Sequence, residues 1–137
     1  MPLSKPLPVL VPARMRRVPQ SFAWIDHRLR SDGILERLRP EDLGLYLFLA
    51  LAADRYGLSC WRLDRIERAV PFDRHALWDA RKHLCELDLI AFRPWRAGDP
   101  DGSYQVLSVE RPKNVLSPEL QQAIDNVFRH GEPERQR

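Results

Sequence analysis

One stretch of the chain, residues 58–109, constrains the fold more than any other. Its apolar residues recur at helical spacing in two successive segments separated by a proline, and two short runs typical of strands follow. This spacing predicts a helix over residues 62–69, a tight turn, and a second helix capped by Asp73. The later runs, residues 89–93 and 104–109, predict two strands joined by a loop rich in turn-forming residues.

The second of these helices has two distinct faces. Leu77, Ala80, Leu84 and Leu87 follow a helical spacing and predict the buried side. The other side and its flanks are basic and aromatic, so we expect nucleic-acid contacts from Arg74, His75, Trp78, Arg81 and Lys82.

Alternative roles stay open for three of these side chains. Arg74 and Arg81 could instead pair with Asp79 or with acids of the preceding helix. Trp78 is either an exposed contact residue or is covered by the N-terminal arm or by a partner. At the end of the first strand and in the loop that follows it, we expect phosphate or minor-groove contacts from Arg93, Trp95 and Arg96.

A further helix is predicted to begin at Pro40, where Glu41 and Asp42 oppose the positive end of the helix dipole. The following sequence, LGLYLFLALAA, is apolar on every face, which predicts a helix at the centre of the core. Gly57 is a candidate C-cap for this helix. Residues 59–61 are a candidate for a short first strand. Ile34, Leu35 and Leu38 suggest a short helix before Pro40.

The first 20 residues form an arm with five prolines and four basic residues. Proline fixes φ and removes amide donors, so the arm is expected to be extended or disordered when free. Arg14, Arg16 and Arg17 are candidates for minor-groove contacts, although the arm could instead fold onto an acidic surface of its own chain. The domain is expected over residues 21–111, with an apolar cluster near Phe22, Trp24 and Ile25. Ser21–Leu29 fits a strand or a helix equally well.

A C-terminal amphipathic helix is predicted over residues 112–131, with a disordered tail at 132–137. Ser117 and Pro118 mark its start and Gly131 its end. The apolar residues of this helix form one stripe that has to be buried, either against its own domain or against a second chain. We expect a homodimer that buries Leu120, Ala123, Ile124, Val127 and Phe128.

Composition narrows the function classes. The formal net charge is +3, and residues 1–39 hold eight Lys and Arg against three acids, a distribution suited to a polyanionic partner. Two isolated cysteines and a proline-interrupted N-terminus indicate a reducing, cytoplasmic setting without a signal peptide or membrane partner. No nucleophile-elbow, zinc-protease or phosphate-loop motif occurs. We therefore expect neither an enzyme nor a metal or cofactor site.

The order helix, turn, helix, strand, loop, strand is that of a winged helix-turn-helix, an α+β fold that is mainly α-helical. From Phe22 to Val109 the chain resembles small winged-helix proteins of bacterial mobile elements and the N-terminal modules of plasmid replication initiators and primosome proteins. The resemblance rests on an aromatic opening segment, the helix PEDLGLYLFLALAADRYG, and the signature Leu84-Cys85-Glu86-Leu87-Asp88-Leu89-Ile90.

Three positions depart from the pattern of these families. Many DNA-binding relatives carry a hydroxyl residue at the position of Ala76 and an arginine at that of Asp79. Asp79 repels phosphate but could accept a hydrogen bond from cytosine. Asp88 replaces the usual glycine that closes the second helix, and it is expected to adopt a left-handed conformation.

The resemblance implies a protein that binds double-stranded DNA, as a regulator or accessory factor of a mobile element. An alternative is a replication-initiator-like DNA binder of a plasmid or phage. Another is a winged-helix adaptor that grips a protein and binds no DNA. A partner protein from a transposition or replication complex is also expected.

Overall fold

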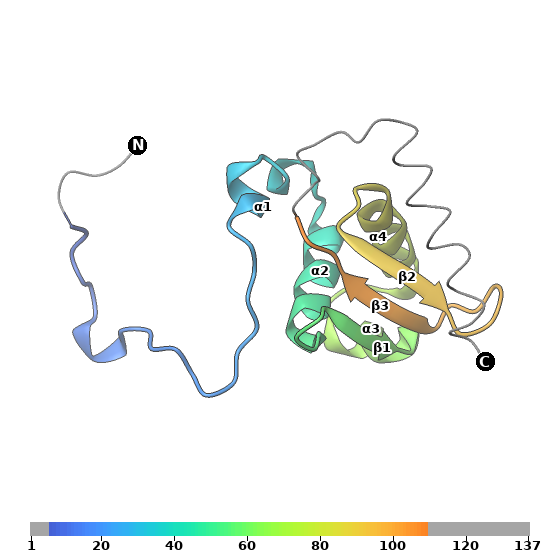
Figure 1. The fold of residues 1–137 in the computed structure, drawn as a ribbon, viewed down its shortest axis with the longest axis horizontal. Helices are drawn as coiled ribbons and strands as arrows, with labels where there is room; N and C mark the ends of the chain where they lie inside the picture. Colours follow the sequence, from blue (N-terminus) through green and yellow to red (C-terminus); the bar gives the residue numbers. More distant parts are fainter. Residues whose placement is uncertain (1–5, 110–137) are drawn as a thin grey trace, which may run out of the picture.

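The computed structural model describes residues 6–109, and these residues form four α-helices and a three-stranded antiparallel sheet (Figure 1). In chain order the elements are α1 (Arg28–Ser31), α2 (Pro40–Ala52), β1 (Leu58–Trp61), α3 (Leu63–Ala69), α4 (Arg74–Glu86), β2 (Ile90–Pro94) and β3 (Gly102–Val106). The fold is α+β, and this order is compatible with a winged-helix layout. No helix within residues 6–109 has the length and hydropathy required to cross a bilayer.

The predicted start of α2 at Pro40 is confirmed. Arg39 precedes the helix in an extended conformation, and the Asp42 carboxylate accepts a hydrogen bond from the Arg39 backbone amide at 2.9 Å. The predicted C-cap at Gly57 is wrong, because α2 already ends at Ala52. Gly57 instead has a φ of 88° in the turn before β1, where an added Cβ would lie 2.5 Å from the Val106 carbonyl oxygen.

The prediction that α2 is surrounded by protein is also wrong. Leu45 and Leu49 are fully buried, but Leu43, Leu47 and Leu51 are exposed along one side of the helix. Within residues 6–109, α2 packs against α3, α4 and the sheet, and these elements do not enclose the whole helix. One apolar side of α2 is therefore left uncovered by the described part of the chain.

The predicted α3–turn–α4 segment is confirmed. Asp73 caps α4 by accepting a hydrogen bond from the Ala76 amide at 2.8 Å. Leu77, Ala80 and Leu84 are fully buried in the core, as expected from their spacing. Asp88 has a φ of 63°, which confirms the left-handed conformation that redirects the chain into β2.

β3 is the central strand of the sheet and pairs with β1 on one side and β2 on the other. The expected strands after α4 are confirmed with small shifts, β3 beginning two residues earlier and ending three residues earlier than predicted. Tyr104 of β3 and Ile90 of β2 complete the core against α2 and α4. Residues 95–101 form the loop between β2 and β3.

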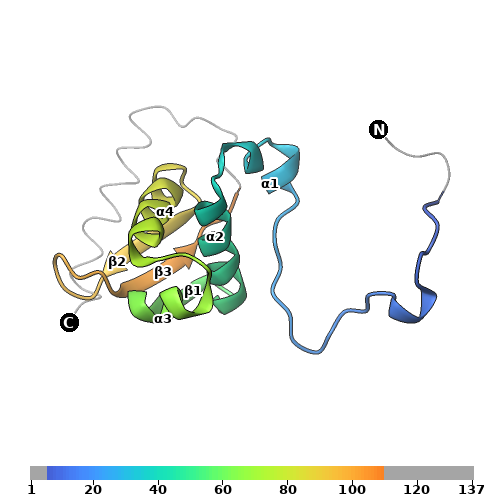
Figure 2. The same cartoon turned by 180° about the vertical axis from the view of Figure 1, so that it is seen from behind.

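Most of the chain before α1 extends away from the packed domain (Figures 1 and 2). Ser21–Leu29 is neither the strand nor the full helix considered above, since regular structure begins with the single turn of α1. Phe22, Trp24 and Ile25 do not form a buried cluster but are exposed. The short helix expected before Pro40 is a 3-10 turn at Leu35–Arg37.

The predicted C-terminal helix and tail lie outside the described residues, and so does the predicted dimerisation stripe. The homodimer therefore stays a prediction from the sequence.

Candidate nucleic-acid interface

The solvent-facing side of α4 brings together four of the predicted contact residues, Arg74, His75, Trp78 and Lys82. Arg74, Trp78 and Lys82 follow each other at intervals of four, which places them on one side of the helix. The opposite side is held in the core by Leu77, Ala80 and Leu84. The His75 side chain is 87% exposed. The buried stripe thus fixes which residues α4 presents to a partner.

Arg81 was predicted to contact nucleic acid, but its side chain is buried and does not belong to the exposed side of α4. It is only 6% exposed. Its Nη1 atom donates to the Pro100 carbonyl at 2.7 Å and to the Tyr104 hydroxyl at 2.9 Å. Its guanidinium also lies over the Phe92 ring at 3.8 Å. Arg81 therefore links α4 to the β2–β3 hairpin and has no face left for a phosphate.

Trp78 lies between the two roles considered for it. Its side chain is 46% exposed, and the Arg81 guanidinium lies 4.7 Å from its ring centroid. The ring is therefore supported from within the domain while half of its surface remains available to a partner.

Replacing Trp78 with Ala is expected to lower the free energy of unfolding by about 1 kcal/mol, because a half-exposed ring contributes less than the roughly 3–5 kcal/mol of a core aromatic. Chemical denaturation measures the loss. The control is Trp61→Ala, because the Trp61 ring packs edge-on against Phe48 at 4.8 Å beside the core. Equal losses in the two variants would contradict the exposed role of Trp78.

Asp79 does not pair with Arg74 or Arg81. Its carboxylate lies 3.5 Å from the His75 Nε2 atom, one helical turn away. Among the described residues Arg74 makes no ion pair, although its backbone amide donates to Glu67 at 3.0 Å. The Arg74 guanidinium therefore stays available to a partner, and the Asp79 carboxylate faces the His75 ring.

The β2–β3 hairpin carries the other predicted contact residues, and all three are exposed: Arg93 lies near the end of β2, and Trp95 and Arg96 lie in the loop. The loop is closed by a hydrogen bond from the Trp95 amide to the Asp101 carbonyl at 3.1 Å. The Asp101 carboxylate is turned inward, where it accepts from the Leu63 amide at the start of α3 at 2.7 Å. Because this carboxylate points into the domain, its negative charge repels an approaching DNA phosphate less than the position of Asp101 in a surface loop suggests.

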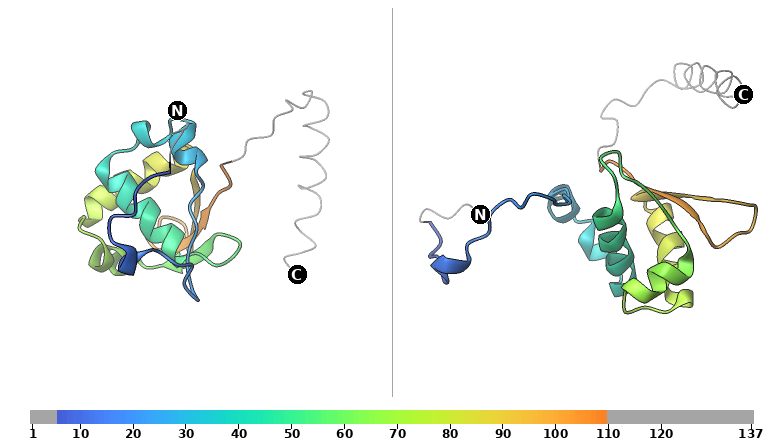
Figure 3. Two further views of the ribbon diagram at one scale, coloured as in Figure 1. Left: turned by 90° about the vertical axis from the view of Figure 1, so that its left-hand side faces the viewer. Right: turned by 90° about the horizontal axis from the view of Figure 1, so that it is seen from below.

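The three arginines of the arm are not brought together with α4. Arg14, Arg16 and Arg17 are exposed. The arm leaves the domain on the side of α1, whereas the β2–β3 loop projects at the opposite end (Figures 1 and 3).

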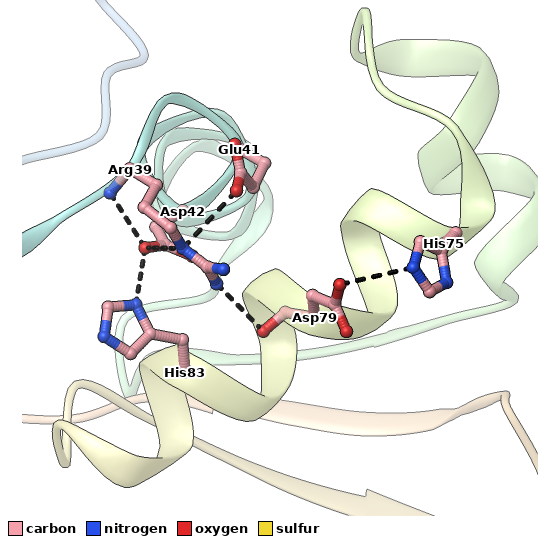
Figure 4. Close-up of polar contacts among 6 residues, drawn as sticks. All are labelled: Arg39, Glu41, Asp42, His75, Asp79 and His83. Carbon is pink, nitrogen blue, oxygen red and sulfur yellow. Dashed lines mark hydrogen bonds and ion pairs between the residues drawn. The ribbon is translucent and has the colours of Figure 1, made fainter.

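A polar cluster that joins α2 to α4 was not predicted from the sequence (Figure 4). Asp42 is fully buried, and its carboxylate accepts from Arg39 and lies 2.6 Å from the His83 Nδ1 atom. Burial alone would raise the pKa of Asp42, but the hydrogen bonds from Arg39 and His83 outweigh it and hold that pKa below its usual value. Arg39 also donates to the Asp79 carbonyl at 3.3 Å. The cluster fixes α4 on its inner side.

Within residues 6–109 no group of three or more His, Cys, Asp or Glu side chains is arranged to hold a metal ion. Comparison with protein-family models, curated proteins and solved structures finds no match.

Proposed function

We propose that this protein is a winged-helix DNA-binding protein in which α4 is the recognition helix and residues 95–101 form the wing. The observation that supports this most strongly is that α4 has one buried side and one exposed side. Its inner side is fully buried, while Arg74, Trp78 and Lys82 lie exposed along the other. An α-helix is about 10–12 Å across, which matches the roughly 12 Å width of the DNA major groove.

In this mechanism α4 enters the major groove, and Arg74 and Lys82 reach phosphates or guanine edges. Arg93 and Arg96 of the hairpin meet the adjacent backbone. Arg81 acts indirectly, because its bonds to Pro100 and Tyr104 connect α4 to the hairpin. The arm, with Arg14, Arg16 and Arg17, would add contacts only by bending round the duplex. No catalytic step follows binding.

The cellular role proposed is that of a regulator or accessory factor of a mobile genetic element, and it rests on the sequence resemblance. A second candidate is a protein–protein adaptor. The half-exposed rings of Trp78 and Trp95 and the acidic Asp79 favour that alternative, because such a surface also suits a protein partner.

Replacing Arg74 or Lys82 with Ala is expected to weaken binding to all DNA duplexes similarly. The slope of log K against log salt concentration should fall by roughly 0.9 for each phosphate that the variant no longer neutralises. Fluorescence anisotropy with two unrelated duplexes over a series of salt concentrations measures both effects.

The matched control is Arg30→Ala, which removes one exposed positive charge from α1, on the side of the domain away from the wing (Figure 1). This variant should keep the wild-type slope. If all three variants shared the wild-type slope, α4 would not be the DNA-contacting helix.

A further inference from the structure

A groove of about 670 Å³ lies on the domain away from Arg74, Trp78 and Lys82. Four segments line it, namely the chain before α1, the second half of α2 through Tyr46 and Ala50, the turn before β1, and the end of β3 with the residues after it. Its floor is held by a hydrogen bond from the Val106 amide to the Gly57 carbonyl at 2.8 Å. We call it the α2 groove, with the apolar lining residues Phe22, Trp24, Tyr46, Ala50, Val106 and Val109.

The rim of the α2 groove exposes large apolar side chains. Trp24 is 72% exposed, and Phe22 and Tyr56 are similarly open to solvent. On α2, Leu47 and Leu51 are also exposed, on the side of the helix next to the one that carries the groove residues Tyr46 and Ala50. Exposed apolar surface of this kind is typical of a docking site. None of these residues belongs to the proposed DNA interface, so DNA binding would leave the groove open.

The chain itself carries a suitable occupant. Val109 is the last residue described and lines the groove, and residues 110–137 follow it. These residues contain an apolar stripe at helical spacing, Leu120, Ile124, Val127 and Phe128. Seven residues separate Val109 from Ser117, and they can span up to about 25 Å when extended. The stripe can therefore return to the groove beside which its connection begins.

We infer that residues 117–131 dock with this stripe in the α2 groove of the same chain. A short connection gives the stripe an effective concentration in the millimolar range, which favours docking within one chain over pairing between two chains. The docked segment would cover Phe22 and Trp24 and fasten the chain before α1 to the domain. The homodimer expected from the sequence would then need a different surface.

Hydrogen exchange of the full-length protein, followed by mass spectrometry, tests this inference. Amides in residues 22–26 and 120–128 should both be protected, and to the same degree over a wide range of protein concentration. Ile124→Asp/Phe128→Asp should speed exchange in both segments by roughly tenfold or more. The control Gln122→Asp/Asn126→Asp adds the same charge beside the stripe and should keep wild-type protection.

A variant on the groove side tests whether the lost protection reflects docking or only a local change in the C-terminal segment. Trp24→Asp alters an exposed side chain, so the core peptides of α4 should keep their protection while residues 120–128 lose theirs. The inference is overturned if residues 120–128 exchange freely in the wild type, or if Trp24→Asp leaves them protected. Protection that grows with concentration, together with a doubled mass in light scattering, would show that a second copy fills the groove and would equally overturn docking within one chain.

Discussion

Replacing Asp42 with Asn is expected to lower the free energy of unfolding by about 2–4 kcal/mol, one of the two largest losses that the structure predicts. The Asp42 carboxylate is fully buried and has Arg39 and His83 as partners. An amide of the same shape cannot balance the positive charge of Arg39 and offers one acceptor oxygen in place of two. Denaturant titration at neutral pH measures the loss. Asp32→Asn, at an exposed position after α1, is the matched control and should cost less than about 0.5 kcal/mol.

The pH dependence of stability provides a second measurement on the same residue. The folded protein holds the pKa of Asp42 below its unfolded value, so the unfolded chain binds the proton more tightly. The stabilisation is complete above the unfolded pKa of about 3.9 and is lost as pH falls through the lower folded pKa. Asp42→Asn should remove this part of the acid dependence. An unchanged acid profile in the variant would contradict the role assigned to the cluster.

The other large effect is expected for Arg81. Arg81→Ala should cost about 2–4 kcal/mol of unfolding free energy, because the Tyr104 hydroxyl and the Pro100 carbonyl lose their donor and the Phe92 ring loses its cover. Arg74→Ala removes the same kind of side chain from an exposed position of the same helix and should cost less than about 0.5 kcal/mol. Thermal and chemical unfolding of the two variants measure their free energies of unfolding relative to the wild type. Similar stabilities would mean that Arg81 is not the link between α4 and the hairpin.

Local signals in the sequence were sufficient to predict the elements that present the candidate site. The Asp73 cap, the stripe of Leu77, Ala80 and Leu84, and the left-handed Asp88 all act within a few residues. Each can therefore be predicted without knowledge of the tertiary structure, and each is confirmed.

Arg81 was misassigned although a local signal was present, whereas the other missed features depend on contacts between distant segments. Arg81 follows Leu77 by four positions and precedes Leu84 by three, so it belongs on the buried side of α4, and this spacing could have identified it. The exposure of Leu47 on α2 had no such signal, because an all-apolar helix does not indicate which side its neighbours leave open. The link between Asp42 and His83 joins residues 41 positions apart. The only local signal is that Asp42 occupies the third helical position after Arg39, where an acid can accept a hydrogen bond from the residue before the helix.

The central claim is that this domain binds duplex DNA through α4 and the β2–β3 hairpin. It is tested most directly by electrophoretic retention of a labelled random duplex by the wild-type protein at low salt, with and without unlabelled competitor. The account predicts retention that weakens steeply as salt rises and that is reduced in Arg74→Ala and Lys82→Ala but not in Arg30→Ala. Free migration of the duplex at every protein concentration would contradict it and would favour the adaptor.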